Sequence, residues 1–297
     1  MQRRLTANWQ QHLSAAILRG TFYLNPDIAI GMRPQVEQLL TKGDLYRNDI
    51  IALERIDILA YSGDDEMEDA GEISEEAKVV VLPIKGTMLK YGTLCTYGMD
   101  EIAYYTKHFA SREDVGAIVL DIDTGGGATN SVPPILEAIN FVRSQGKPIV
   151  AHVDYACSAG QWVSAACDHT FIDNAQSTMG SIGVMISMLD VIPYYESIGA
   201  KYHEIYADQS GDKNQAIQKF LKGEYDQIKQ EMLNPLAIQF QEAIKSFRGT
   251  KLSMDTPGLL TGATFMGQKA IDAGLADQFG TLTQAINYAA AQAWASS

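Results

Sequence analysis

The sequence lacks the features that mark secreted and membrane proteins. Its 297 residues include three cysteines, Cys95, Cys157 and Cys167, and an odd number without a regular framework is typical of a reducing compartment. No run of 18 apolar residues occurs, and no apolar stretch follows the basic residues at the N-terminus. These absences predict a soluble, cytoplasmic protein with neither a signal peptide nor a membrane span.

Metal-ligand spacing and positive charge are also scarce. Cys157 and Cys167 are ten residues apart and the five histidines do not pair at ligand spacing, so neither a metal site nor a cofactor is predicted. The formal net charge of −13 argues against a nucleic-acid partner, because phosphates would repel such a surface. Acidic side chains without an intervening base are concentrated in one short block: Asp64, Asp65, Glu66, Glu68, Asp69, Glu72, Glu75 and Glu76.

Composition changes along the chain predict three parts. Residues 1–61 mix short helical patterns with polar breaks and form an N-terminal extension or a propeptide-like segment. Residues 62–78 contain the acidic block and are interpreted as a solvated linker. Residues 79–297 carry strong strand and helix patterns and are predicted to form one folded domain, with enough apolar residues for a real core.

The patterns in this third part predict an α/β fold. Apolar, β-branched runs alternate with a helix that has Ser131 as its N-cap and two prolines in its first turn. This rhythm implies right-handed crossovers and a largely parallel sheet. Later helices are expected at residues 223–247, interrupted at Pro235, and at 283–294. The expected strands are residues 79–84, 117–122, 148–153, 169–173, 184–189 and 203–207.

Two small-residue segments, each placed after an expected buried strand, carry the chemistry. Ser158 stands at the start of a helix, where backbone N–H groups are unpaired and the helix dipole is positive. Alone, it is more typical of an N-cap than of a nucleophile. The triple glycine at residues 125–127 changes this balance, because bare backbone amides can approach a developing oxyanion. A tight turn or a phosphate loop are the alternatives for the glycines, although no Gly-Lys-Ser/Thr follows.

A serine nucleophile also needs a base, and the sequence leaves several candidates. His152 and His169 are the nearest histidines, but neither lies in a recognisable triad context. Lys213 follows an expected strand and could act as a buried, neutral amine, although its local sequence is more typical of a solvated surface lysine. Cys157 could replace Ser158 as the nucleophile. If Ser158 begins the helix, however, Cys157 belongs to the preceding strand and points elsewhere.

Five ordered motifs resemble the signal peptide peptidase A and phage protein C family of serine peptidases. The nucleophile segment is similar to residues 157–161 (CSAGQ) and the Asn-Ser-Pro-Gly-Gly turn to residues 123–127 (DTGGG). An Ala-Ala-Asp motif is similar to residues 166–168 (ACD), and a Thr-Gly-Ser-Ile-Gly-Val motif to residues 179–184 (MGSIGV). A glycine-rich C-terminal signature matches between Gly262 and Asp277. The resemblance covers residues 79–286, about two thirds of the chain.

This resemblance implies the Clp protease/crotonase fold, with repeated β-β-α units, and a Ser-Lys dyad. The nucleophile corresponds to Ser158. The oxyanion donors correspond to the backbone N–H groups of Gly127 and Ala159, with Gly126 adjacent. Lys213 is the best match for the base, although it comes about two residues late, and Lys219 and Lys222 are fallbacks.

Without a membrane anchor, the chain is most similar to the phage-type branch of head-maturation proteases. The resemblance implies a peptide or protein substrate such as a capsid or scaffold protein, a homo-oligomer, and a place in the bacterial host cytoplasm or an assembling prohead. Two other functions stay open. One is an inactive, scaffold-like or structural member of the fold, and the other is a crotonase-like acyl-CoA enzyme.

Overall fold

Strands and helices alternate through the middle of the chain and build a parallel sheet. The computed structural model describes residues 21–24, 57–60, 78–92, 96–188 and 190–296. Strand β3 (Lys78–Lys85) is followed by helix α3 (Met99–Ala110), strand β4 (Val115–Thr124) by helix α4 (Val132–Ser144), and strand β6 (Ile149–Cys157) by helix α5 (Ala159–Ala166). The crossing helices let β3, β4 and β6 lie side by side and parallel.

The main sheet has eight strands, and most of its pairings are parallel. Its principal order is β10 (Thr264–Met266), β8 (Thr178–Gly180), β6, β4, β3 and β2 (Asp57–Ala60). Strand β7 (His169–Ile172) pairs with β6, and β11 (Gln278–Phe279) pairs with β7, both in parallel. Only β2 and β10 pair antiparallel within this sheet, both at its ends. The prediction of an α/β fold with a largely parallel sheet is confirmed.

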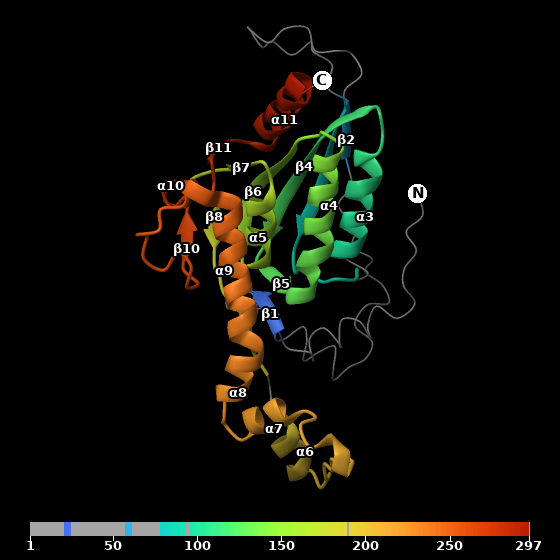
Figure 1. Ribbon diagram of the computed structural model, residues 1–297, viewed down its shortest axis with the longest axis vertical. Coiled ribbons are helices and arrows are strands. Elements are labelled where there is room, and N and C mark those ends of the chain that lie inside the picture. Colours follow the sequence, from blue (N-terminus) through green and yellow to red (C-terminus); the bar gives the residue numbers. More distant parts are fainter. Residues whose placement is uncertain (1–20, 25–56, 61–77, 93–95, 189, 297) are drawn as a thin grey trace.

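Helices cover both faces of this sheet (Figure 1). Side chains of α3, α4, α5 and α9 (Asn234–Arg248) share one buried cluster with alternate residues of the strands, such as Val80 and Leu82. Helix α11 (Leu282–Ser296) packs on the opposite face against Val79 and Val81. Because successive strand residues point to opposite faces, an uninterrupted apolar run serves both layers.

The C-terminal glycine-rich signature ties these layers together. Asp277 accepts hydrogen bonds from the Thr170 amide, at 2.8 Å, and from both terminal nitrogens of the buried Arg248 guanidinium, at 3.0 and 2.9 Å. Burial raises the pKa of this carboxyl, but these charge-assisted bonds and Lys251 outweigh burial and lower the pKa to about 2. Asp277 therefore stays ionised and joins β7 to the end of α9.

Three local expectations need correction or refinement. Ser131 occupies the N-cap position of α4, but its hydroxyl donates to the Ala128 carbonyl at 2.6 Å and makes no cap bond. Residues 203–207 form no strand and pair with none of the strands that the structure describes. The break expected at Pro235 is instead a helical join, where α8 (Asp226–Ile228) and a π-helical turn (Lys229–Leu233) run into α9. Proline is tolerated there because it stands in the first turn of α9.

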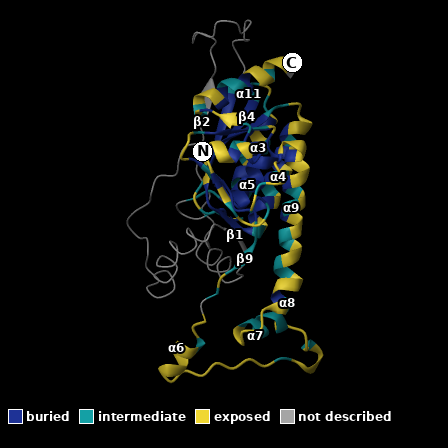
Figure 2. Ribbon diagram, turned by 90° about the vertical axis from the view of Figure 1, so that its left-hand side faces the viewer, coloured by how far each residue is buried: buried dark blue, intermediate teal, exposed yellow. Residues whose placement is uncertain are grey.

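Between β9 (Met185–Ile186) and α9 the chain forms an arm, which we define as residues 190–228. It contains α6 (Ile192–Ser197), a 3-10 turn (Asp208–Ser210), α7 (Gln215–Leu221) and α8. Figures 1 and 2 both show α6 and α7 beyond the end of the sheet, away from the buried interior. Its exposed apolar side chains include Tyr194, Tyr195, Ile198, Tyr202 and Ile205.

A small second sheet lies at the end of the main sheet nearest the arm. Strand β1 (Thr21–Leu24) is its middle strand and pairs antiparallel with β5 (Gly126–Ala128) and with β9. Thus both described segments of the first 61 residues, β1 and β2, pair with strands of the later part of the chain. Within the described ranges, no helix is both long and apolar enough to cross a bilayer.

Candidate active site

Ser158 occupies a strained turn between β6 and α5. Its backbone has φ of 55° and ψ of −115°, a region that a residue with a side chain rarely adopts. It is buried, with 1% of its surface exposed, and it makes no side-chain cap bond although it stands at the N-cap position. A sharp strand-to-helix turn with a strained serine is the geometry of a nucleophile elbow. The N-cap interpretation of Ser158 is therefore not supported.

Neighbouring segments hold this turn from both ends. The Ser158 amide donates to the Gly180 carbonyl at 2.8 Å, and the Trp162 amide donates to the Ser158 carbonyl at 3.0 Å. The amide of Gly180 in turn donates to Oε1 of the fully buried Gln161 at 3.1 Å. Gly180, which lies in the motif at residues 179–184, thus braces the serine through a backbone bond. Such bonds offset a strain of about 1–3 kcal/mol.

The triple-glycine turn lies beside this elbow. At the ends of the two parallel strands, Thr124 of β4 pairs with Ala156 of β6, two residues before Ser158. The Thr124 hydroxyl donates to the Gly86 carbonyl and accepts the Gly126 amide at 3.0 Å. A Cβ added to Gly160 would come within 2.6 Å of the Thr124 methyl group. The glycine turn and the first turn of α5 therefore pack in direct contact.

The predicted oxyanion residues differ in how their backbone is used. Gly126 has φ of 101°, which suits glycine, and its amide is already bonded to Thr124. Gly127 lies between two residues that bond to Met88, since the Met88 amide donates to Gly126 and the Ala128 amide donates to Met88. Consecutive strand residues direct their amides to opposite edges, so the Gly127 amide faces the other edge. Ala159 is the first residue of α5, where amides have no partner within the helix.

Neither nearby histidine is positioned as a base for Ser158. His152 has both ring nitrogens engaged, Nδ1 with Asp121 at 2.7 Å and Nε2 with Asp173 at 3.2 Å. His169 stacks on Tyr288 of α11, with ring centroids 4.4 Å apart, on the face of the sheet opposite α5. Cys157 is fully buried as the last residue of β6. The lysines named from the sequence therefore stay the predicted candidates for the base.

The three candidate lysines all belong to the arm. Lys213 is exposed and lies between the 3-10 turn and α7, with its amide bonded to the Ser210 carbonyl at 3.1 Å. Lys219 is half-buried and approaches Gln215, while Lys222 is exposed. Figure 1 shows α7, which Lys213 precedes in the chain, beyond the end of the sheet, whereas α5, which follows Ser158, packs within the body. The geometry of the dyad therefore stays a prediction.

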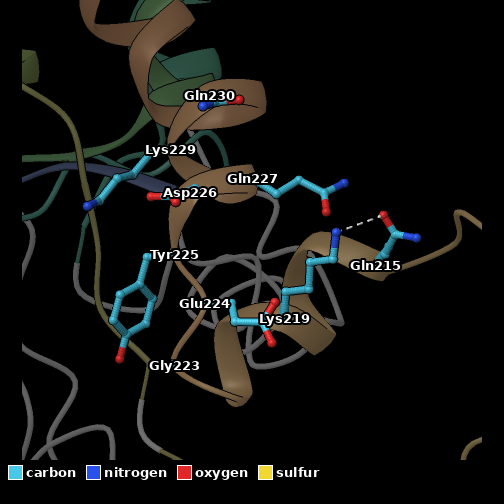
Figure 3. Close-up of a pocket in the computed structure, with 9 residues that line it drawn as sticks. All are labelled: Gln215, Lys219, Gly223, Glu224, Tyr225, Asp226, Gln227, Lys229 and Gln230. Carbon is cyan, nitrogen blue, oxygen red and sulfur yellow. Dashed lines mark hydrogen bonds between the residues drawn. The ribbon is translucent and has the colours of Figure 1, made fainter.

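A hollow of about 660 Å³ lies in the arm, where α7 meets α8 (Figure 3). Its lining mixes the acids Glu224 and Asp226 with Lys219 and Lys229. A pocket for the phosphates of an acyl-CoA would instead need an excess of basic groups. This hollow therefore offers no support for the acyl-CoA alternative, and it is remote from the glycine turn.

Two supporting residues were not recognised from the sequence, although both lie within the quoted motifs. Thr124 connects the glycine turn to Gly86 and packs against Gly160, and Gln161 orients the Gly180 turn. Their roles depend on long-range backbone partners, which residue type alone does not indicate. The pairing of β1 with β5 was also not expected, because four residues carry too weak a pattern to define a strand partner.

The parallel α/β sheet carries the strained serine at a helix start beside the glycine turn, and these elements together form the candidate site. The model of peptidase family S49 matches residues 142–296, slightly more than half of the chain. The chain belongs to this family.

Among curated relatives, the head-tail preconnector protein GP5 of Enterobacteria phage P21 is 30% identical over 216 residues, which cover 70% of this chain and 42% of the relative. The capsid assembly protease C of Escherichia phage lambda is 30% identical and covers 80% of this chain and 54% of the relative. A putative signal peptide peptidase SppA of Enterococcus faecium is 25% identical, and the match covers 73% of this chain and 67% of the relative. The chain spans about half the length of the two phage relatives.

Solved structures give weaker likenesses. A membrane-bound stomatin-specific protease is 14% identical, with a TM-score of 0.35 and coverage of 69% of this chain and 80% of the other. ThnE from S. clavuligerus is also 14% identical, with a TM-score of 0.39, and the match covers 72% of this chain and 79% of the other.

Proposed function

We propose that the protein is a serine endopeptidase in which Ser158 is the nucleophile and Lys213 is the general base. The single observation that carries this proposal is the strained conformation of Ser158 at the start of α5. A backbone strain of this kind is retained where the surrounding structure enforces it, and it clusters at catalytic sites. Membership of peptidase family S49 supports the same chemistry.

The reaction follows from the groups at the elbow. Ser158 Oγ attacks the carbonyl carbon of the scissile peptide bond as its proton passes to the Lys213 amine. The developing oxyanion accepts hydrogen bonds from the amides of Gly127 and Ala159, and Gly126 shapes the turn that presents them. The protonated lysine then gives its proton to the leaving amine. Water then hydrolyses the acyl-enzyme. Lys213 takes a proton from the water as its oxygen attacks the acyl carbon, and the lysine returns this proton to Ser158 Oγ as the ester bond breaks.

We propose that this base is supplied on assembly. A lysine acts as a base only when it is uncharged, and removal from water favours that state. Lys213 is exposed on the arm, so it must be covered before it can act. We propose that the arm of one copy docks on the body of a neighbouring copy and carries Lys213 to Ser158 there. The exposed apolar side chains of the arm support such a contact.

We infer that the substrates are proteins of phage capsid assembly, such as a scaffold or capsid protein. The two phage relatives, whose names refer to capsid assembly and to a head-tail preconnector, support this inference. An extended protein segment also suits a site flanked by short strands. The corresponding place of action is the bacterial host cytoplasm or an assembling prohead.

The test is active-site labelling of the full chain with a fluorophosphonate near pH 8, followed by mapping of the adduct by mass spectrometry. We expect labelling at Ser158 and its loss in Ser158→Ala, while Ser253→Ala, a control on an exposed loop, still labels. Lys213→Ala should lower the labelling and peptide-cleavage rates by about 10²–10⁴ while assembly persists. An assembled oligomer that does not label would instead favour the inactive, structural alternative.

A further inference from the structure

The segment Thr21–Leu24 lies between the two strands that adjoin the candidate site. Strand β1 pairs on one edge with β5, with Phe22 opposite Ala128, Tyr23 opposite Gly127 and Leu24 opposite Gly126. On its other edge, Thr21 and Phe22 lie opposite Ile186 and Met185 of β9. Phe22 is therefore paired through its backbone on both sides. In sequence, β1 is about 100 residues from β5 and about 160 residues from β9.

Both partner strands adjoin segments that lie beside the serine turn. Strand β5 contains the glycines of the predicted oxyanion pocket. Strand β9 begins five residues after Gly180, whose carbonyl accepts the Ser158 amide. The backbone groups that pair with β1 thus belong to the two walls of the candidate active site.

Without β1, these two walls would be separated by the width of one strand. Neighbouring strands lie about 4.8 Å apart, so β5 and β9 would leave a gap of roughly 10 Å. Each edge would present unpaired N–H and C=O groups, and a single extended chain running antiparallel to both would satisfy them. The groove between β5 and β9 is therefore shaped for an extended peptide, and here the protein's own chain fills it.

Occupation by β1 also conflicts with the proposed catalysis. The Gly126 carbonyl and the Ala128 amide bond to Met88 on one edge of β5, so the Gly127 amide faces the edge on which Tyr23 lies. That amide is the predicted oxyanion donor. A substrate strand and β1 would compete for the same backbone groups, and both cannot be bound at once.

We propose that Thr21–Leu24 is an intramolecular pseudosubstrate strand that blocks the peptide-binding groove between β5 and β9 until it is displaced. The proposal rests on the proposed function, because it needs Ser158 to be the reacting serine. Covalent tethering keeps the strand at a high effective concentration, on the order of mM, so a weak backbone pairing suffices for inhibition. A protein substrate must compete with this strand.

Phe22→Pro tests the proposal, because proline lacks the N–H group and cannot occupy a strand that is paired on both edges. We expect fluorophosphonate labelling of Ser158 in the full-length variant to be roughly tenfold faster than in the parent chain, because backbone pairing in the groove is lost. A short fluorogenic peptide should show a lower KM with little change in kcat. Leu59→Pro, placed in β2 of the same N-terminal extension, is the control and should label at the parent rate.

A peptide added in trans provides a second measurement that is independent of the folding of one variant. A synthetic peptide of residues 17–28 should slow the labelling of the Phe22→Pro protein, whereas the same peptide carrying proline at position 22 should not. Equal labelling of Ser158 in the parent and in Phe22→Pro, with no effect of either peptide, would overturn the pseudosubstrate proposal alone. Absence of labelling in every variant would overturn the proposed function itself.

Discussion

At the scale of single residues, the site depends on contacts that leave no space for extra atoms. Gly160 lies against Thr124, which is itself 1% exposed and bonded at its hydroxyl to Gly86 and Gly126. The threonine methyl group cannot move away without breaking these bonds. The glycine turn and the serine turn are therefore positioned by one small interface, and its geometry sets the distance between the predicted oxyanion donors and Ser158.

Gly160→Ala tests this interface. Its new Cβ would lie 2.6 Å from the Thr124 methyl group, so α5 or the glycine turn must shift. We expect a loss of about 1–3 kcal/mol in the free energy of unfolding, which is typical of overpacking, together with slower labelling of Ser158. Urea denaturation measures the first effect. Gly211→Ala is the matched control, because a Cβ there meets nothing within 4 Å and stability should be unchanged.

At the scale of elements, strand β6 serves two different environments. On the face toward α5, it contributes apolar residues to the larger core. On the other face, Val150 packs against α11, and His152 is the next residue of that face. His152 lies between Asp121, which also bonds Lys85 at 2.8 Å, and Asp173. Burial lowers the pKa of His152, but the hydrogen bonds to the two carboxylates outweigh burial and the pKa is raised. The buried charges are thus satisfied in a small network.

This raised pKa predicts that His152 makes stability depend on pH. Its contribution is fully present below the unfolded value of about 6.5 and is lost as pH rises through the folded pKa. The free energy of unfolding of the parent should therefore exceed that of His152→Gln at pH 6, and this difference should shrink as the pH rises to 9. Urea denaturation at each pH measures it.

The comparison with His152→Gln is needed because His169 acts in the opposite direction. Burial lowers the pKa of His169, so its contribution is present above the unfolded pKa and is lost as pH falls. Both proteins keep His169, and its effect cancels in the difference between them. A difference in stability that stays constant from pH 6 to pH 9 would contradict the role given to His152.

At the scale of the whole molecule, the arm separates the two members of the proposed dyad. Figure 2 shows the buried residues concentrated in the body, while the arm is largely exposed. The Ile205 side chain is 94% exposed and several tyrosines of the arm are more than half exposed, which is unusual for a surface without a partner. A second copy of the chain would cover this surface and would supply the missing base.

Mixing two inactive variants tests this arrangement. Ser158→Ala keeps the lysine and Lys213→Ala keeps the serine, so each should be inactive alone. If the arm acts on a neighbouring copy, co-expression of the two with different tags should restore activity at about a quarter of the sites by random pairing. Peptide cleavage by the doubly tagged oligomer is the measurement. A mixed oligomer that stays inactive would show that Lys213 does not act across copies.

The sequence by itself determined the α/β class, the order of the central strands and helices, and the position of Ser158 between a strand and a helix. These features are local, because apolar periodicity and small residues at an element boundary act over a few neighbouring positions. The predicted strand at residues 203–207 shows the limit of this reasoning. Its pattern is suitable, but within the described residues it pairs with no strand.

Only the tertiary structure decided how the serine is strained, which segments brace it and what fills the groove beside it. The Ser158 conformation depends on the Gly180 carbonyl, and the place of β1 depends on backbone groups of β5 and β9 far along the chain. Backbone hydrogen bonds of this kind are available to every residue type except proline as donor, so they leave no pattern in the sequence. The candidate residues of the site could therefore be named from the sequence, whereas the pairing of the N-terminal strand β1 with β5 and β9 could not.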